Sequence, residues 1–391
     1  SMRTCAIIHP LHLKLETATP YKPYKPCNSV EFSMIHYPSA KTNARSNRLP
    51  SLDMLRGMTI VLMIITSYHG NVSQSFSSLV QTFGCGLRIA DLVVPVFFWI
   101  IGLSFSLSIS SRLAKGATKL QLFNHVLVRS ALLYMIGLAL DASTCLDTPD
   151  RFTCLFESRL FGIFQRIAFS YLCAAPVVIF TGWRGQFSML MATCLGYQLY
   201  INGLDFQICD QTYRRTLMTT IPGTSLILAG SLAGFFVRPV RSVRGSHTLM
   251  ILGSILILGS FALNSSIPFY FQQLNLTACL LSAGVAMLLF TILNLIENEW
   301  LSKSWGALLI ALGQNPLVLY ITSALLYLAG HAIGVHQSPN SWISSWDYGW
   351  IICTSLVGQP QLASLLMSLI LLAASTGIVW LLSRNGIVIK L

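Results

Sequence analysis

The chain contains 391 residues, of which 54% are hydrophobic and only 10% are charged. A soluble globular domain carries about 25% charged residues, so this composition excludes an ordinary soluble enzyme and also a disordered chain. The net charge is +12, and many of the basic residues lie in short segments between apolar blocks. Basic residues in such loops set the orientation of a membrane protein and contact anionic lipid headgroups. We therefore expect membrane lipids as partners and no nucleic acid.

The first 48 residues differ from the rest of the sequence. They are polar and basic, contain a YKPYKP run at 21–26, and lack the apolar segment of a secretory signal. We therefore expect residues 1–48 to form a flexible cytosolic arm and residues 49–391 to form a transmembrane domain.

Apolar blocks follow one another from residue 50 onward, each near the ~20 residues that cross a membrane as a helix. The blocks are continuous rather than alternating, which favours helices over the strands of a barrel. The block at 348–358 is too short to cross, so a re-entrant or interfacial segment is expected there. The sequence therefore predicts an all-α polytopic bundle of about ten spans, at residues 54–70, 89–109, 122–140, 161–181, 186–203, 217–237, 247–264, 276–296, 306–330 and 362–383.

The charges between the spans predict the orientation of the bundle. With the N-terminus inside, basic residues such as Arg112 and Lys115 concentrate in the inner loops, whereas acidic residues dilute the basic ones in the outer loops. Both termini are therefore predicted to be cytosolic. Cys145 and Cys154 then share one outer loop, where they can pair if that loop faces an oxidising compartment.

Ionisable side chains inside a span are costly, so each one is a candidate site residue. Asp53 and Arg56 are three residues apart at the inner start of the first span, where they can pair or anchor the helix at the membrane boundary. His69 ends the same span on the outer side, either as an interfacial residue or as part of an outer site.

Two charged residues are expected to meet in the outer half of the membrane. Asp91 begins the second span, where it either serves a site or caps its own helix. Arg166 lies in the fourth span beside Gln165, at a similar depth to Asp91. We therefore expect Asp91 and Arg166 to share one enclosed cavity, with a purely structural ion pair as the alternative. Arg129 lies in the inner half of the third span, farther from Asp91.

The ninth span carries two further candidates. Pro316 interrupts it, and the preceding Asn315 either caps the break or contacts a ligand. His331 ends this span on the outer side and is either interfacial or part of an outer cluster with Asp91. The ten cysteines show no metal-ligand spacing, so no metal is expected.

Six segments, in order, resemble the heparan-alpha-glucosaminide N-acetyltransferase family. The likeness covers roughly residues 48–391 and implies about ten helices that pass an acetyl group from cytosolic acetyl-CoA to an acceptor across the membrane. It thus implies acetyl-CoA or another acyl-CoA as cosubstrate and no permanently bound cofactor. The matching segments are RLPSLDMLRGMTIVLMI at 48–64, IADLVVPVFFWIIGLSFSLS at 89–108, VRSALLYMIGL at 128–138, FGIFQRIAFSYL at 161–172, TIPGTSLILAGSLAG at 220–234 and LGQNPLVLY at 312–320.

Two positions depart from the pattern of the family. Its N-Y-G-G and H-x-x-W-N-G motifs supply an Asn and a His for acyl transfer, but Ser67 and Gln81 stand here instead. Because glutamine is no general base, the resemblance implies a rewired site. In that site we expect His69 to act as the base, Gln81 to donate to the oxyanion, and Arg166 to bind a CoA phosphate or an acceptor anion.

Other functions stay open beside the acyltransferase. A protonated Asp91 in a dry aromatic cavity can start the cyclisation of an isoprenoid, whose cations aromatic faces would stabilise. A non-catalytic transporter or lipid-binding protein is the third alternative. The expected substrate is a small molecule or an isoprenoid lipid, and a homodimer stays open. The catalytic candidates are Asp91, His69, Gln81 and Arg166, and the binding candidates are Gln165, Asp53, Arg56, Arg129, Asn315 and His331.

Overall fold

The computed structural model describes residues 49–82, 84–144, 162–203, 220–237, 243–301, 304–338 and 341–384. Within these ranges the chain forms twelve α-helices, one short 3-10 helix and one two-stranded hairpin. The prediction of an all-α polytopic bundle is therefore confirmed. The predicted arm at 1–48 and the cysteines Cys145 and Cys154 lie outside the described residues.

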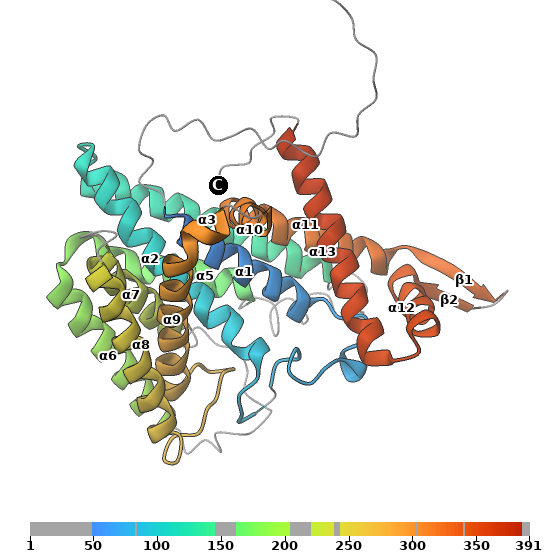
Figure 1. Ribbon diagram of the computed structural model, residues 1–391, viewed down its shortest axis with the longest axis horizontal. Helices are drawn as coiled ribbons and strands as arrows, with labels where there is room; N and C mark the ends of the chain where they lie inside the picture. Colours follow the sequence, from blue (N-terminus) through green and yellow to red (C-terminus); the bar gives the residue numbers. More distant parts are fainter. Residues whose placement is uncertain are drawn as a thin grey trace, which may run out of the picture. The chain divides into compact units, whose positions relative to one another are not determined.

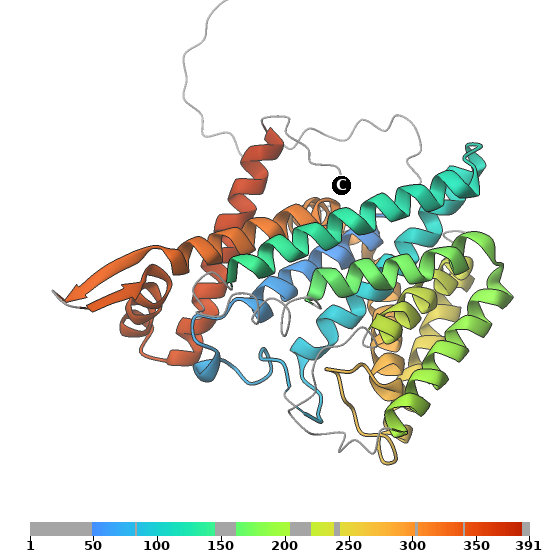
Figure 2. The ribbon, with the colours of Figure 1, turned by 180° about the vertical axis from the view of Figure 1, so that it is seen from behind.

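The helices follow the predicted apolar blocks closely. Figure 1 shows α6, α7 and α8 toward one end of this bundle and α13 toward the other, and Figure 2 shows α3 beside α5. The helices are α1 Pro50–Ser67, η1 Val72–Gln74, α2 Ile89–Ala114, α3 Lys119–Thr144, α5 Ile163–Phe180, α6 Trp183–Asn202, α7 Thr220–Val237, α8 Val243–Leu263, α9 Leu276–Leu301, α10 Ser304–Gln314, α11 Pro316–Ala332, α12 Ser345–Val357 and α13 Pro360–Arg384, and the antiparallel strands are β1 Gly334–Ser338 and β2 Ser341–Ser344.

The number of spans differs from the prediction at α6. Eight described helices are long and apolar enough to cross a membrane, or nine if the bent pair α10 and α11 counts as one span. The predicted span at 186–203 is helical but does not reach this hydropathy. Its polar residues include Gln186 and Gln198, which are buried and accept hydrogen bonds from Ser231 Oγ at 2.9 Å and from the backbone N–H of Leu276 at 3.1 Å.

A proline shapes the C-terminal part of the bundle. The ninth span bends by 85° between α10 and α11, where Pro316 opens the second helix, so the predicted break is confirmed. The short block at 348–358 covers most of α12 and its C-cap Gly358, and this helix of 13 residues is not among the candidate spans. The hairpin β1–β2 leads directly into α12, which packs against α13 (Figure 1).

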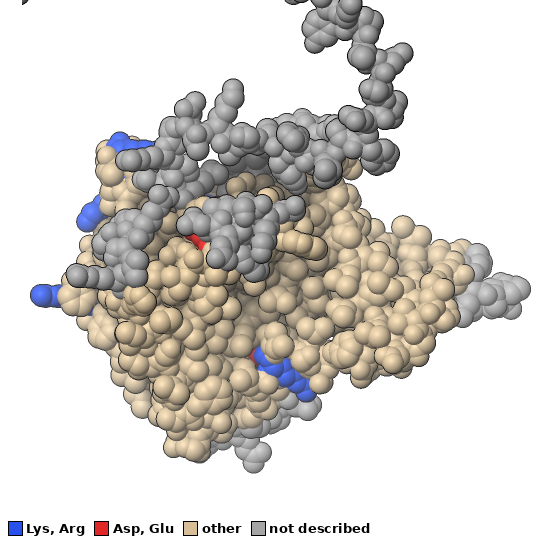
Figure 3. Space-filling view, viewed as in Figure 1, with Lys and Arg blue, Asp and Glu red and all other residues tan. Residues whose placement is uncertain are grey.

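The charges and the core follow the pattern of a membrane bundle. Most of the described surface visible in Figure 3 carries neither basic nor acidic side chains. Inside, α2 and α7 approach at backbone distance, because a Cβ at Gly102 would overlap the carbonyl oxygen of Ile227 and a Cβ at Gly230 would overlap that of Trp99. Gly57 and Gly313 join α1 to α10 in the same way. Glycine therefore permits both helix pairs to pack at backbone distance.

Candidate functional site

A cavity of about 520 Å³ lies among α1, α2, α3, α5 and the bend before α11. This volume falls within the range of small-molecule sites. Its wall includes the arginines Arg56, Arg112 and Arg129 together with His125. Because these residues stand near the predicted cytosolic ends of their helices, we call it the inner cavity.

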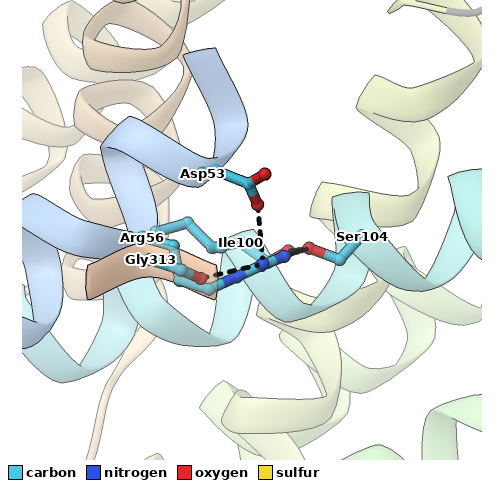
Figure 4. A network of polar contacts seen from close by, with 5 residues as sticks. All are labelled: Asp53, Arg56, Ile100, Ser104 and Gly313. Carbon is cyan, nitrogen blue, oxygen red and sulfur yellow. Dashed lines mark hydrogen bonds and ion pairs between the residues drawn. The ribbon is translucent and has the colours of Figure 1, made fainter. Parts of the chain in front are cut away.

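Arg56 joins three elements at the wall of the inner cavity (Figure 4). Its Nη1 atom lies 3.0 Å from Asp53 Oδ1 and donates to the carbonyl oxygen of Gly313 at 3.3 Å. Its Nη2 atom donates to Ser104 Oγ at 2.5 Å, and Ser104 donates to the carbonyl oxygen of Ile100 at 2.7 Å. The predicted Asp53–Arg56 pair therefore forms, and it ties α1 to α2 and to the end of α10.

Arg112 and Arg129 carry positive charge that no described acidic residue neutralises through an ion pair. The Arg129 guanidinium lies 5.9 Å from the ring centre of Tyr171, and Arg112 Nη2 lies 3.3 Å from His125 Nε2. Arginine binds phosphate oxygens through parallel hydrogen bonds. The inner cavity therefore has the charge and the donors to hold an anionic ligand.

A second cavity, of about 360 Å³, lies at the outer end of α1 and is bounded by α3, α5 and α11. We call it the outer cavity. The structure brings the predicted His69 and Gln81 together in its wall, along with Ser67 and Asp141. A possible base and several hydrogen-bonding groups thus face one space at the predicted outer side of the membrane.

His69 is held in place at the edge of the outer cavity. Its side chain hydrogen-bonds to the backbone of Thr66, and its own carbonyl oxygen accepts a hydrogen bond from Trp346 Nε1 at 3.1 Å. Burial lowers the pKa of His69 below its ordinary value, although the hydrogen bond to Thr66 opposes this shift. The imidazole is therefore neutral near pH 7 and able to accept a proton.

Asp141 is a wall residue that the sequence reasoning missed. The sequence indicates only that it is one of the acidic residues on the outer side, but it lies near the end of α3, and its Oδ2 atom accepts a hydrogen bond from Gln165 Nε2 at 2.8 Å. Gly162 permits this contact, since a Cβ there would overlap Asp141 Oδ2. The sequence feature that points to Asp141 is its position at the predicted outer end of the third span, on the same side of the membrane as His69. Gln165 is fully buried behind it.

Asp91 stabilises its own helix instead of meeting Arg166. Its carboxylate accepts hydrogen bonds from the backbone N–H of Thr82 at 2.9 Å, from Thr82 Oγ1 at 2.7 Å and from the backbone N–H of Arg88 at 2.9 Å. It lines neither cavity, and it forms no ion pair with Arg166 among the described residues. At the third position of α2 the carboxylate turns back to the helix N-terminus, and through Thr82 it positions the neighbouring Gln81.

The remaining candidates separate into two groups. Asn315 lies at the bend, makes no capping bond with its side chain, and lines the inner cavity, so the structure favours the ligand-facing alternative. Arg166 and His331 line neither cavity. His331 is exposed and lies against Tyr327 and Trp346, with ring centres 4.3 and 5.9 Å away.

Asp91→Asn should loosen the loop that carries Gln81. At least one of the three donors would then face an amide NH₂ group, which costs about 1–3 kcal/mol for a buried partner. We expect faster hydrogen–deuterium exchange in peptides covering 79–90. The matched control is Asp347→Asn at the exposed start of α12, which should leave this loop unchanged. Equal exchange in the Asp91 variant and the unmodified chain would contradict the positioning role.

Comparison with known proteins agrees with the resemblance seen in the sequence. The profile described as "Heparan-alpha-glucosaminide N-acetyltransferase, catalytic" matches residues 48–271. The chain is 33% identical over 149 residues to heparan-alpha-glucosaminide N-acetyltransferase of Mus musculus, covering 38% of this chain and 22% of that protein. For the Homo sapiens protein of the same name the identity is 32% over 136 residues, covering 34% and 20% respectively. The matched part of the chain thus spans about a fifth of the length of these relatives.

Proposed function

Because the chain belongs to the heparan-alpha-glucosaminide N-acetyltransferase family, we propose that it moves an acyl group from acyl-CoA in the inner cavity to an acceptor in the outer cavity. The membership makes it a multi-pass membrane protein of a transferase family. The acyl-CoA donor and a hydroxyl or amine acceptor are the specific parts of the proposal.

The observation that carries this proposal is the pairing of two unlike cavities. The inner one presents Arg112 and Arg129, whose charges suit the phosphates of CoA. The outer one presents the neutral imidazole of His69 and the amide of Gln81. Phe164 and Tyr320 line both cavities, so the two spaces lie back to back.

The groups in the outer cavity suit acyl transfer. The acceptor oxygen or nitrogen attacks the thioester carbonyl, and the acceptor proton passes to the imidazole of His69. Gln81 donates to the negative oxygen that develops on the carbonyl. The C–S bond then breaks, the acyl group stays on the acceptor, and the proton returns from His69 to the CoA thiolate. In this scheme Asp91 acts only by positioning the loop of Gln81.

The orientation with both termini cytosolic is part of the same proposal. Cys85 lies in the loop before α2, on the predicted outer side, and it forms a disulfide. Disulfides persist in oxidising compartments and are rare in the cytosol. This supports an outer cavity that faces a lumen or the cell exterior and an inner cavity that faces the cytosol.

The geometry gives the isoprenoid cyclase no comparable support. A proton-started cyclase needs a carboxylic acid directed into the substrate cavity. Asp91 lines neither cavity, and its three hydrogen-bond partners all donate to the carboxylate.

Arg129→Gln provides the test of the CoA site. We expect the purified full chain in lipid nanodiscs to transfer acetyl groups from acetyl-CoA to hydroxyl or amine acceptors, detected by mass spectrometry as an added acetyl group. The variant should raise the KM for acetyl-CoA about tenfold, because one charged hydrogen-bond donor to phosphate is lost. The matched control is Arg184→Gln, whose guanidinium lies by Trp183, outside both cavities. Absence of acyl transfer together with absence of CoA binding in calorimetry would overturn the proposal.

A further inference from the structure

The two cavities share part of their walls. Among the described residues that line them, only Phe164 and Tyr320 belong to both walls. Phe164 comes from the first turn of α5, and Tyr320 comes from the second turn of α11. The two cavities therefore adjoin at these two residues.

The two rings form a compact partition. Their centres are 5.2 Å apart and their planes meet at 73°, which is the edge-to-face arrangement. Each residue is only 8% exposed. Tyr68, at the end of α1, supports the partition from the outer side, with its ring centre 5.8 Å from that of Tyr320. The rings thus fill the passage between the two spaces.

The contact between the two rings is weak. An edge-to-face aromatic pair contributes only about 0.5–1.5 kcal/mol beyond the area it buries. On its inner side the wall near the rings is apolar and includes Ile60, Met63 and Leu133. These apolar side chains suit an acyl chain beside the rings and disfavour water there.

We propose that Phe164 and Tyr320 form an aromatic gate that seals the inner cavity from the outer one and limits the size of the acyl group that passes. The seal follows from the two cavities alone, whereas the limit on acyl size rests on the proposed function. The Phe164 ring is the movable part, since α5 begins here beside Gly162 and Tyr320 is supported by Tyr68.

The seal can be tested without any enzymatic activity. A reporter cysteine is introduced in the outer cavity by Ser67→Cys, and a membrane-impermeant thiol reagent is applied to the inner face of sealed proteoliposomes. We expect labelling of this cysteine from the inner face to be at least tenfold faster with Phe164→Ala than without it. A second reporter, Ser108→Cys on the wall of the inner cavity, should be labelled equally in both backgrounds and confirms the side and the fold.

The matched control is Phe169→Ala on the same helix. Phe169 makes a similar edge-to-face contact with Tyr134, at 5.4 Å, but lines neither cavity. Labelling that does not change with Phe164→Ala, or that rises equally with Phe169→Ala, would overturn the gate. If Phe164→Ala lowers the yield of folded protein, Phe164→Leu provides a milder opening and should give an intermediate labelling rate.

A second measurement tests the limit on acyl size. The ratio of kcat/KM for hexanoyl-CoA to that for acetyl-CoA should rise at least tenfold in Phe164→Ala and stay constant in Phe169→Ala. An unchanged ratio would overturn the proposed limit on acyl size. The seal between the cavities would still be decided by the labelling experiment. If the unmodified chain transfers no acyl group at all, the proposed function fails, but the labelling experiment still decides the gate.

Discussion

Gly102→Leu should destabilise the folded bundle by about 3 kcal/mol, because overpacking at this position cannot be relieved by a side-chain movement. The added Cβ would overlap a carbonyl oxygen of α7, and Gly230 already uses the reciprocal contact with α2. The two helices would have to separate, which opens the core around the fully buried Trp99 and Ile227. The measurement is the thermal unfolding midpoint and the monodisperse fraction of the protein purified in detergent.

Gly377→Leu is the matched control for this substitution. Gly377 also lies within a membrane helix, α13, but nothing stands within 4 Å of the position its Cβ would take. We expect the unfolding midpoint of this variant to stay close to that of the unmodified chain. Equal midpoints for the two leucine variants would contradict backbone-distance packing of α2 on α7.

His69→Ala should lower kcat for acyl transfer by about 10²- to 10⁴-fold, the usual contribution of a general base. The substitution removes the imidazole from the outer cavity and leaves the arginines of the inner cavity in place, so the KM for acyl-CoA should change little. His331→Ala is the control, since His331 lines neither cavity and should retain full activity. Full activity of the His69 variant would remove this residue from the mechanism.

The pH profile gives a second measure of the same role. Burial lowers the pKa of His69, so its base form persists below the ordinary histidine pKa of about 6.5. kcat should therefore stay level from neutral pH to below roughly 6.5 and fall only at more acidic pH, as the imidazole becomes protonated. If kcat instead begins to fall above pH 7 as the solution is acidified, the titrating group is not His69.

The architecture could be predicted because hydropathy records which segments are surrounded by lipid. Even the break at Pro316 was visible, since proline lacks the N–H that continues a helix. The α6 segment shows the limit of this signal. Gln186 and Gln198 lower its hydropathy, yet both side chains bond within the bundle and are not exposed to lipid.

The site could be predicted only in part, because sequence gives the depth of a residue in the membrane but not the direction in which its helix face points. His69 and Gln81 were expected on the outer side and do share a cavity. Asp91 and Arg166 were expected at similar depths, yet Asp91 bonds instead to Thr82, nine residues before it. The sequence does not identify Asp141 as a site residue, because a charged residue at the end of a span can belong either to a loop or to a cavity wall.

The bend before α11 also has an electrostatic consequence. In the interior of a continuous helix the peptide groups are paired with one another. The bend brings the first residues of α11 to the cavity wall, from Pro316 to Val318, and the side chain of Asn315 does not cap this end. The aligned peptide dipoles of a helix are equivalent to roughly half a positive charge at its N-terminus. The backbone itself thereby adds to the attraction for an anion, with no need for another arginine in the membrane.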